Sequence, residues 1–146
     1  MLHPKHVCVI SLLALAVAGT IEARNTLSRF PLADALGTTA AKSRLDPDVK
    51  LYFGNQPHAT PIKTLGTAKT NKKTNFFNKS DKAGCEWAFL SAMLQLQQRA
   101  KTDGGNAVIN IKSITNTEEL VSETEYLCRA GAVTGGVVFV GEVVKL

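Results

Sequence analysis

The sequence has 146 residues, of which 17 are Lys or Arg and 12 are Asp or Glu, giving a formal net charge of +5. This length is that of one domain with room for a hydrophobic core. Beyond residue 23 no stretch is long and apolar enough to span a bilayer, which excludes a protein with several membrane spans.

The first 23 residues have the three parts of a secretory signal peptide. A short basic start precedes an apolar stretch over residues 7–18, and Ile21 and Ala23 stand where a signal peptidase reads the chain. This pattern predicts cleavage after Ala23, with a cut after Ala18 as the second choice. The alternative is an uncleaved membrane anchor, but an apolar run of about 12 residues is short of the roughly 20 that a spanning helix needs. We therefore expect a periplasmic or secreted protein without residues 1–23.

Export changes the cysteine count. Cys8 leaves with the signal peptide, so Cys85 and Cys128 remain as a pair in an oxidising compartment. A disulfide between them would add roughly 4 kcal/mol by the chain-entropy estimate. The alternatives are two free thiols or half of a metal site, although no histidine lies near either cysteine in the sequence. We expect the Cys85–Cys128 disulfide.

The first half of the mature chain predicts short elements separated by loops. Residues 24–48 contain two prolines and many small or polar residues, and predict a poorly structured segment with helical turns at 32–36. Residues 49–53 alternate as a strand does, and residues 55–66 predict a loop. Residues 67–77, rich in Thr and Lys, predict an edge strand whose lysines discourage pairing with another chain.

The clearest element is a helix from about Lys82 to Thr102. Ser80 or Asp81 supplies an oxygen for the free amides of the first turn. The glycines within residues 103–106 end the helix. One apolar stripe recurs at helical spacing. It consists of Cys85, Phe89, Met93, Leu96 and Ala100.

Three strands are expected after the helix, over residues 107–114, 123–130 and 137–145, with a glycine-rich turn at 131–136. In the first strand, Ile109 and Ile111 are expected on one face. The second strand alternates strictly, so two sets of side chains take opposite faces. The first set is Thr124, Tyr126, Cys128 and Ala130, and the second is Glu123, Glu125 and Arg129.

These elements predict one α+β domain over residues 49–146. The apolar stripe of the helix would lie across one face of a small, mainly antiparallel sheet. In that arrangement Cys85 on the stripe and Cys128 on the inward face of its strand can meet. The predicted disulfide and the predicted packing therefore support each other.

The charges are concentrated in two stretches. Lysines gather between residues 63 and 82, where Asp81 is the single acid, and an acidic run follows over residues 118–125. A basic stretch is typical of binding to nucleic acid or to an anionic lipid, or of a solvated edge. Export makes nucleic acid the least accessible partner, so we expect an envelope protein or an anionic envelope component. The candidate partner-binding residues are Lys69, Lys72, Lys73 and Trp87, although the rarity of exposed tryptophan favours a core or second-layer position for Trp87.

The sequence offers little catalytic chemistry. His58 is the only histidine after residue 23, and no spacing of Cys, His and carboxylates matches a metal site, so no metal and no cofactor are expected. A nucleophile elbow and a phosphate loop are also missing, which excludes an ATPase by motif. The acidic run could supply paired carboxylates for acid–base work, although nothing apolar flanks it to raise a pKa. Its carboxylates are Glu118, Glu119, Glu123 and Glu125.

Several segments together resemble a family of small exported proteobacterial proteins. The shared features are Lys-Ser-Asp at 79–81, Cys-x-Trp-Ala-Phe-Leu at 85–90, Gly-x-Asn-Ala-Val-x-Asn-Ile ending at Ile111, Thr-Glu-Tyr-x-Cys at 124–128, Gly-Glu-Val-Val-Lys-Leu at 141–146 and Lys-Leu-Tyr-Phe-Gly at 50–54. Members often carry the label "excinuclease ATPase subunit", which implies DNA repair. More distantly, the helix followed by Gly-x-Asn-Ala-Val-Ile is similar to YbjQ-like and Rcs stress-sensor-type domains, which implies one helix packed on a sheet.

The sequence thus favours a non-enzymatic binding domain of the cell envelope. The first alternative is an envelope enzyme that uses the carboxylates of residues 118–125. The second is the DNA-repair role that the family label implies, which the missing phosphate loop and the export signal disfavour.

Overall fold

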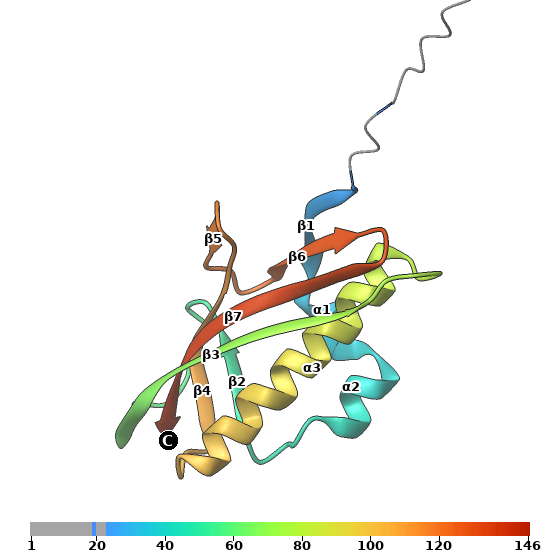
Figure 1. The fold of residues 1–146 in the computed structure, drawn as a ribbon. Helices are drawn as coiled ribbons and strands as arrows, with labels where there is room; N and C mark the ends of the chain where they lie inside the picture. Colours follow the sequence, from blue (N-terminus) through green and yellow to red (C-terminus); the bar gives the residue numbers. More distant parts are fainter. Residues whose placement is uncertain (1–18, 20–22) are drawn as a thin grey trace, which may run out of the picture.

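A computed structural model describes residue 19 and residues 23–146 of the chain (Figure 1). The predicted signal peptide lies outside these residues apart from Gly19 and Ala23. The elements are β1 (Asn25–Pro31), α1 (Leu32–Gly37), α2 (Thr39–Arg44), β2 (Lys50–Phe53), β3 (Lys63–Asn75), α3 (Asp81–Thr102), β4 (Ala107–Ile114), β5 (Glu119–Leu120), β6 (Glu125–Gly131) and β7 (Thr134–Lys145). None of the helices in the described part of the chain is long and apolar enough to cross a membrane.

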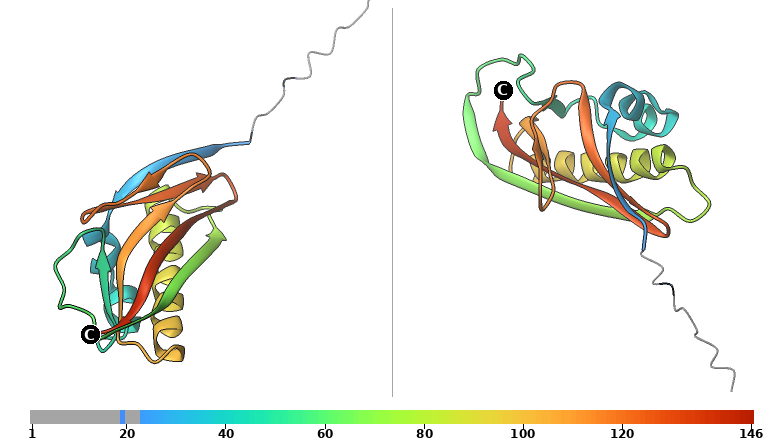
Figure 2. Two further views of the ribbon diagram at one scale, coloured as in Figure 1. Left: turned by 90° about the vertical axis from the view of Figure 1, so that its left-hand side faces the viewer. Right: turned by 90° about the horizontal axis from the view of Figure 1, so that it is seen from above.

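Strand β7 is the centre of a mixed, curled sheet. Along one edge it pairs antiparallel with β3 over its whole length. Along the other edge it pairs with β6 near its start and with β4 over its second half. β1 lies antiparallel outside β6, β2 lies parallel outside β4, and the short β5 pairs with the end of β4. Two groups of strands, which we call the wings, therefore share this edge of β7: β6 with β1 at its start, and β4 with β2 and β5 along its second half. Figure 2 shows the curl that results.

Helix α3 covers one face of this sheet, as the apolar stripe predicts. The Ser80 hydroxyl accepts from the Ala83 N–H at 3.1 Å and caps the first turn. All five stripe residues are buried. The right panel of Figure 2 shows α3 between β3 and the pair of short helices α1 and α2. We call the face covered by α3 the inner face and the opposite face the outer face.

Aromatic side chains fill the space between α3 and the sheet. The rings of Phe89 and Tyr126 are 4.8 Å apart, and those of Phe89 and Phe139 are 5.7 Å apart. The Cys85–Cys128 disulfide joins α3 to β6 beside them, with 5.9 Å between the two Cα atoms. The predicted disulfide is therefore present, and it ties the helix to the sheet within the core.

The N-terminal segment is more ordered than residues 24–48 predict. Helix α1 lies where helical turns are expected at 32–36, whereas α2 follows beyond that range and residues 25–31 form strand β1. This strand pairs with β6, which lies about a hundred residues later, from Asn25–Gly131 to Pro31–Glu125. No local hairpin indicates such a strand, because its partner comes from the far end of the chain.

The described strands pair antiparallel, as expected, with one exception. β2 pairs parallel with β4, because the chain between them runs out along β3 and returns through α3. The expected loop at 55–66 ends earlier, since β3 begins at Lys63, and β3 ends at Asn75 instead of Phe77. At the other end of the chain β7 already begins at Thr134, so the expected turn at 131–136 is shorter.

A bulge in β4 overturns the expected placement of two isoleucines. Asn110 has a φ of 52°, and the register with β7 shifts between Ile109 and Lys112. The extra residue turns Ile111 onto the inner face and leaves Ile109 on the outer face. Ile111 therefore packs in the main core, while Ile109 packs in a small separate cluster with Val144.

Candidate functional site

Two cations face each other across a glycine on the outer face of the sheet. Lys73 of β3 and Arg129 of β6 are both paired directly with Gly136 of β7. Directly paired residues of antiparallel strands point to the same face, so both side chains stand on the outer face. Neighbouring strands are about 4.8 Å apart, which puts the two cationic residues roughly 10 Å apart across the glycine.

Gly136 keeps the space between these cations open. A Cβ atom at this position would come within 2.2 Å of the Lys72 carbonyl oxygen, so the close approach of β7 to β3 requires a residue without a side chain. The row Lys73–Gly136–Arg129 is therefore a gap with a positive group on each side. A phosphate or carboxylate would fit the charge of this gap.

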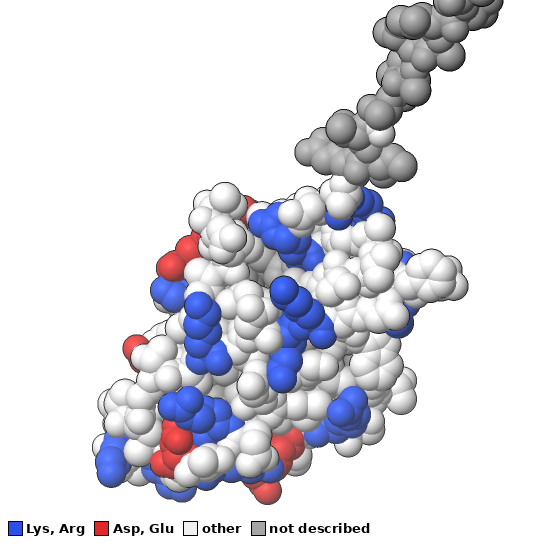
Figure 3. Space-filling view, viewed as in Figure 1, with Lys and Arg blue, Asp and Glu red and all other residues white. Residues whose placement is uncertain are grey.

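A second pair of cations lies further along the same face. Lys69 of β3 and Lys112 of β4 are both paired with Val140 of β7. The Lys112 ammonium binds the Glu119 carboxylate at 2.8 Å, so only Lys69 of this pair is without an ion pair in the described chain. Figure 3 shows Lys and Arg side chains spread over this face, with Asp and Glu side chains toward its left and lower margins. The outer face is therefore predominantly basic.

A groove of about 490 Å³ opens at the first row of cations. It arises because β6 pairs with β7 at Gly136, whereas β4 reaches β7 only from Phe139 onward. The edge of β7 at Val137 and Val138 is left between the two wings, and both residues line the groove. Below it the two wings are bridged by the buried Ser113 hydroxyl, which accepts from the Leu127 N–H at 3.0 Å.

The groove combines positive charge with an apolar wall. Arg24, Lys73 and Arg129 contribute the charge, and Ile114, Leu127 and Val138 contribute apolar surface. None of the described residues that line it is acidic. Such a lining suits a ligand that carries both an anionic group and an apolar part.

The three cations differ in how far they are already engaged. Arg24 forms an ion pair with Asp81, which does not line the groove. Arg129 donates to the Asn25 side-chain oxygen at 3.3 Å, a neutral partner that leaves its charge uncompensated. Lys73 forms no ion pair within residues 23–146. Lys73 and Arg129 are therefore the groups with charge left for a ligand.

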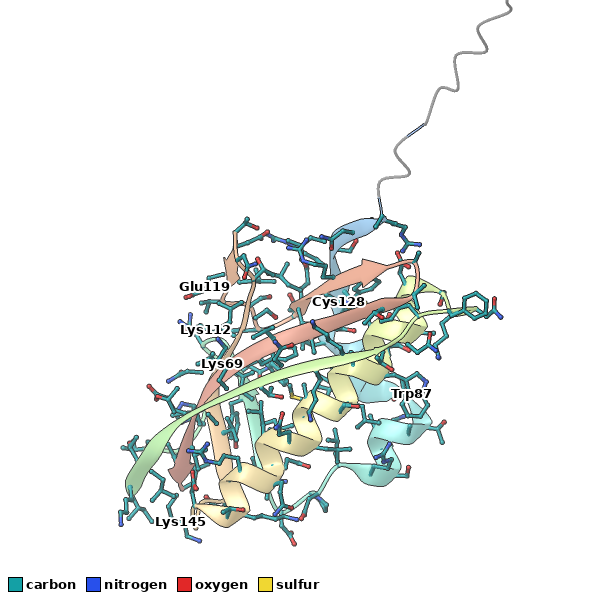
Figure 4. The ribbon with its side chains drawn as sticks, viewed as in Figure 1. Lys69, Trp87, Lys112, Glu119, Cys128 and Lys145 are labelled. Atoms are coloured by element: carbon teal, nitrogen blue, oxygen red, sulfur yellow. A yellow bond between two sulfur atoms is a disulfide. The ribbon has the colours of Figure 1, made fainter. Side chains whose placement is uncertain are left out.

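The structure separates the four residues chosen from the sequence. Lys73 lines the groove, and Lys69 stands on the same face in the second row. Lys72 points to the inner face by the alternation of β3 and is half-buried. Trp87 is 45% exposed and lies over a small niche between α3 and residues 38–40, far from Lys69 in Figure 4. These residues do not form one site.

Sequence reasoning missed Arg129 and Arg24 as site residues. The alternation of β6 correctly places Arg129 on the face opposite Cys128, but it does not show which strand lies beside it. Lys73 and Arg129 are brought together only because β7 lies between β3 and β6. A search of the predicted strands for basic residues on the face opposite the core residues would have found Arg129. It would not have shown that Arg129 lies across β7 from Lys73.

The acidic run lies apart from both the groove and the niche at Trp87. Glu118 binds Arg29 at 2.5 Å and Glu119 binds Lys112, so both carboxylates are held by cations. Neither the groove nor the niche at Trp87 is lined by a residue of this run. Among the residues that the structure describes, no three His, Cys, Asp or Glu side chains cluster as metal ligands would.

Comparisons with family models, with curated proteins and with solved structures gave no match. The resemblance to the exported family therefore stays a prediction from its motifs, and the groove has to be interpreted from its own geometry.

Proposed function

We propose that this protein is an exported, non-enzymatic binding domain that takes the anionic group of an amphiphilic ligand into the outer-face groove. The observation that carries the proposal is the Lys73–Gly136–Arg129 row, in which two uncompensated cations flank an open gap. An arginine and a lysine together supply both directional hydrogen bonds and charge to an oxyanion. The apolar wall of Leu127 and Val138 would hold the rest of the ligand.

Binding fits the groove better than catalysis does. The described residues that line it include no histidine, cysteine or carboxylate that could act as a general base or as an activated nucleophile. The alternative of an enzyme based on residues 118–125 is weakened by the ion pairs of Glu118 and Glu119. A DNA-repair ATPase would need a phosphate loop, which the sequence lacks.

The proposal includes location in the periplasm or outside the cell. It also includes the expectation that the fold is YbjQ-like. A disulfide is typical of an oxidising compartment. Cleavage after Ala23 would also create an α-ammonium group on Arg24, and Arg24 lines the groove. Processing would therefore increase the positive charge of the site. Mass spectrometry of the exported protein tests this step, which requires an N-terminus at Arg24.

The binding experiment uses octyl phosphate below its micelle-forming concentration, with octyl glucoside as the neutral comparison. Titration calorimetry with the processed protein should show binding of the phosphate alone. Lys73→Gln and Arg129→Gln should each weaken binding on the order of tenfold or more, since each removes a charge-assisted contact.

Lys72→Gln is the matched control, because this lysine neighbours Lys73 but points to the inner face. It should leave the affinity for octyl phosphate within about twofold, since a charge outside the groove acts only through screened solvent. If Lys72→Gln and Lys73→Gln weakened octyl phosphate binding equally, the binding would depend on the net charge of the protein and not on the groove. No binding of octyl phosphate by the wild type would refute the proposal.

A further inference from the structure

Two exposed apolar side chains form a tip at one end of the molecule. Phe77 is 62% exposed in the loop between β3 and α3, and Val133 is 60% exposed in the turn between β6 and β7. These two loops are joined, because the Phe76 N–H donates to the Val133 carbonyl at 2.6 Å. We call Phe77 and Val133 together the apolar tip.

The tip is held away from the body of the protein by its own hydrogen bonds. The Phe77 N–H donates to the Asn75 side chain at 2.7 Å, and the Lys79 ammonium donates to the Asn75 carbonyl at 2.8 Å. Asn78 follows with a φ of 59°, a left-handed conformation that asparagine tolerates. Phe76 meanwhile turns inward, where its ring lies against Gly84 of α3. Of two consecutive phenylalanines, one anchors the loop and the other is presented to solvent.

The apolar tip and the groove belong to the same end of the molecule. Asn75, two residues before Phe77, pairs with Thr134, which follows Val133 and lines the groove. In Figure 1 the end of β3 and the β6–β7 turn lie together at the right, close to the start of β1. A flat surface placed against the tip can therefore also meet the mouth of the groove.

The cations around the tip outnumber the free acids. Lys73 and Lys79 form no ion pair within residues 23–146, and Arg129 adds a third uncompensated charge. Asp81 is bound to Arg24, and Asp34 is bound to Lys82 at 2.6 Å. An aromatic and an aliphatic side chain amid basic residues is the composition of a surface that enters the interface of an anionic membrane.

We infer that the tip docks on a bilayer containing anionic phospholipid, where Phe77 and Val133 enter the interfacial layer and the groove receives a lipid phosphate. This inference names the source of the anion and so rests on the proposed function. It explains why the exposed apolar residues and the uncompensated cations occur together at one end. Neither set binds a membrane strongly alone, since a few apolar groups and a few charges each contribute modestly.

The test measures sedimentation of the processed protein with vesicles of phosphatidylcholine alone or with 30% phosphatidylglycerol. The wild type should partition into the anionic vesicles at least tenfold more strongly than into the neutral ones. The double variant Phe77→Ser with Val133→Ser should lose most of this partition while it keeps its affinity for octyl phosphate.

The matched control changes Ile62 and Val121 to serine. Both side chains are exposed, at 80% and 52%, and Ile62 lies beyond the opposite end of β3 from Phe77. A strand of 13 residues spans on the order of 40 Å, so the Ile62 change removes apolar surface far from the tip, and Val121 follows β5, outside the two loops of the tip. It should leave both vesicle binding and octyl phosphate binding within twofold of the wild type.

A spectroscopic variant locates the inserted residue. Replacing Phe77 by Trp in a Trp87→Phe background leaves one tryptophan, at the tip. Its emission should shift to shorter wavelength with anionic vesicles and be quenched by lipids brominated near the headgroup end of the chain. Unchanged emission in vesicles that sediment the protein would overturn insertion at the tip.

The outcomes separate the inference from the proposed function. Binding of octyl phosphate without binding to vesicles refutes the membrane docking alone, whereas binding of neither refutes both. Equal partition into neutral and anionic vesicles also contradicts the inference, because it removes the role of the cations. Sedimentation analysis without vesicles that shows a dimer lost in the tip variant would assign the tip to a second copy of the chain instead.

Discussion

Tyr126 places a hydroxyl group in the aromatic core. The residue is fully buried, and its phenolic oxygen has no hydrogen-bond partner among residues 23–146. Burial raises the pKa of Tyr126 far above its ordinary value, and the negative charges of Glu86 and Asp34 add to the effect. A buried, unpaired polar group costs about 1–3 kcal/mol compared with one that is paired.

We predict that Tyr126→Phe increases the free energy of unfolding by about 1 kcal/mol at neutral pH, since it removes this unpaired group and keeps the ring. The pH dependence should change as well. Above pH 10.0, the ordinary pKa of the side chain, the unfolded chain loses the phenolic proton while the folded chain keeps it, so stability falls as the pH rises. Urea unfolding at pH 7 and above pH 10 should show a smaller alkaline loss in Tyr126→Phe. A destabilised variant would instead mean that the hydroxyl is hydrogen-bonded.

Gln97 is the buried polar residue that fastens α3 to the chain before β2. Its side-chain oxygen accepts from the Asp46 N–H, and its amide donates to the Asp46 and Val49 carbonyls, each at 2.9 Å. Three backbone groups thus depend on one side chain that is 4% exposed. The sequence gives no indication of this role, because Gln97 and Gln98 are adjacent glutamines outside the apolar stripe and the pattern does not distinguish the buried one from the exposed one.

Gln97→Leu should lower the free energy of unfolding by about 2–3 kcal/mol, because it leaves the backbone groups of residues 46 and 49 without partners. Gln98→Leu, at the exposed neighbouring position, is the control and should stay within about 0.5 kcal/mol of the wild type. Denaturant unfolding followed by circular dichroism measures both. Similar values for the two variants would contradict the assigned role.

At the scale of elements, the bulge of β4 decides which face each of its side chains occupies. Asn110 adopts φ 52° and donates to the Glu142 carboxylate of β7 at 3.1 Å. Val108 and Ile111 both point into the core, although they are three positions apart. In a regular strand such residues lie on opposite faces, because side chains alternate, so the extra residue of the bulge is needed. The bulge therefore lets β4 fill the core at both of its ends.

We predict that Asn110→Gly changes the free energy of unfolding by less than about 1 kcal/mol, because glycine adopts a positive φ readily. Asn110→Val should cost at least about 2 kcal/mol, since a β-branched residue is strained in this conformation. Thermal unfolding of the pair provides the comparison. Equal melting temperatures would show that β4 does not need the left-handed residue.

For the whole molecule, the disulfide fixes the helix layer on the sheet. Cys85 and Cys128 are 43 positions apart, and the chain between them contains most of α3, all of β4 and the start of β6. Cross-linking a loop of this size restricts the unfolded chain by roughly 4 kcal/mol in the chain-entropy model. That is a large share of the 5–15 kcal/mol typical of a small domain.

Replacing both cysteines by alanine should therefore lower the free energy of unfolding by about 4 kcal/mol. The wild type in reducing agent should agree with the double variant within about 1 kcal/mol, since both lack the same cross-link. Urea unfolding in oxidising and reducing buffer tests both statements. A loss below about 1 kcal/mol would mean that the restriction of the unfolded chain matters little here.

Much of this architecture follows from local pattern. The spacing of the stripe from Cys85 to Ala100 predicts α3, because a helix repeats every 3.6 residues and buries one side. Alternation in β6 places Cys128 inward, and the two cysteines then meet in the fold as expected. Strand β1 and the bulge at Asn110 escape this reasoning, because the first depends on a distant partner and the second on one backbone dihedral.

By itself the sequence determined the main helix, three strands after it, the pair of cysteines that bond and the excess of positive charge. Only the tertiary structure decided which cations act together. The lysine stretch is split by the pleat of β3, which sends Lys72 inward and Lys73 outward. Arg129 joins Lys73 across Gly136 because β7 pairs with a strand on each edge. Strand order depends on the packing of the whole chain and not on local periodicity. The groove could therefore not be predicted from the sequence of β3 or of β6 alone.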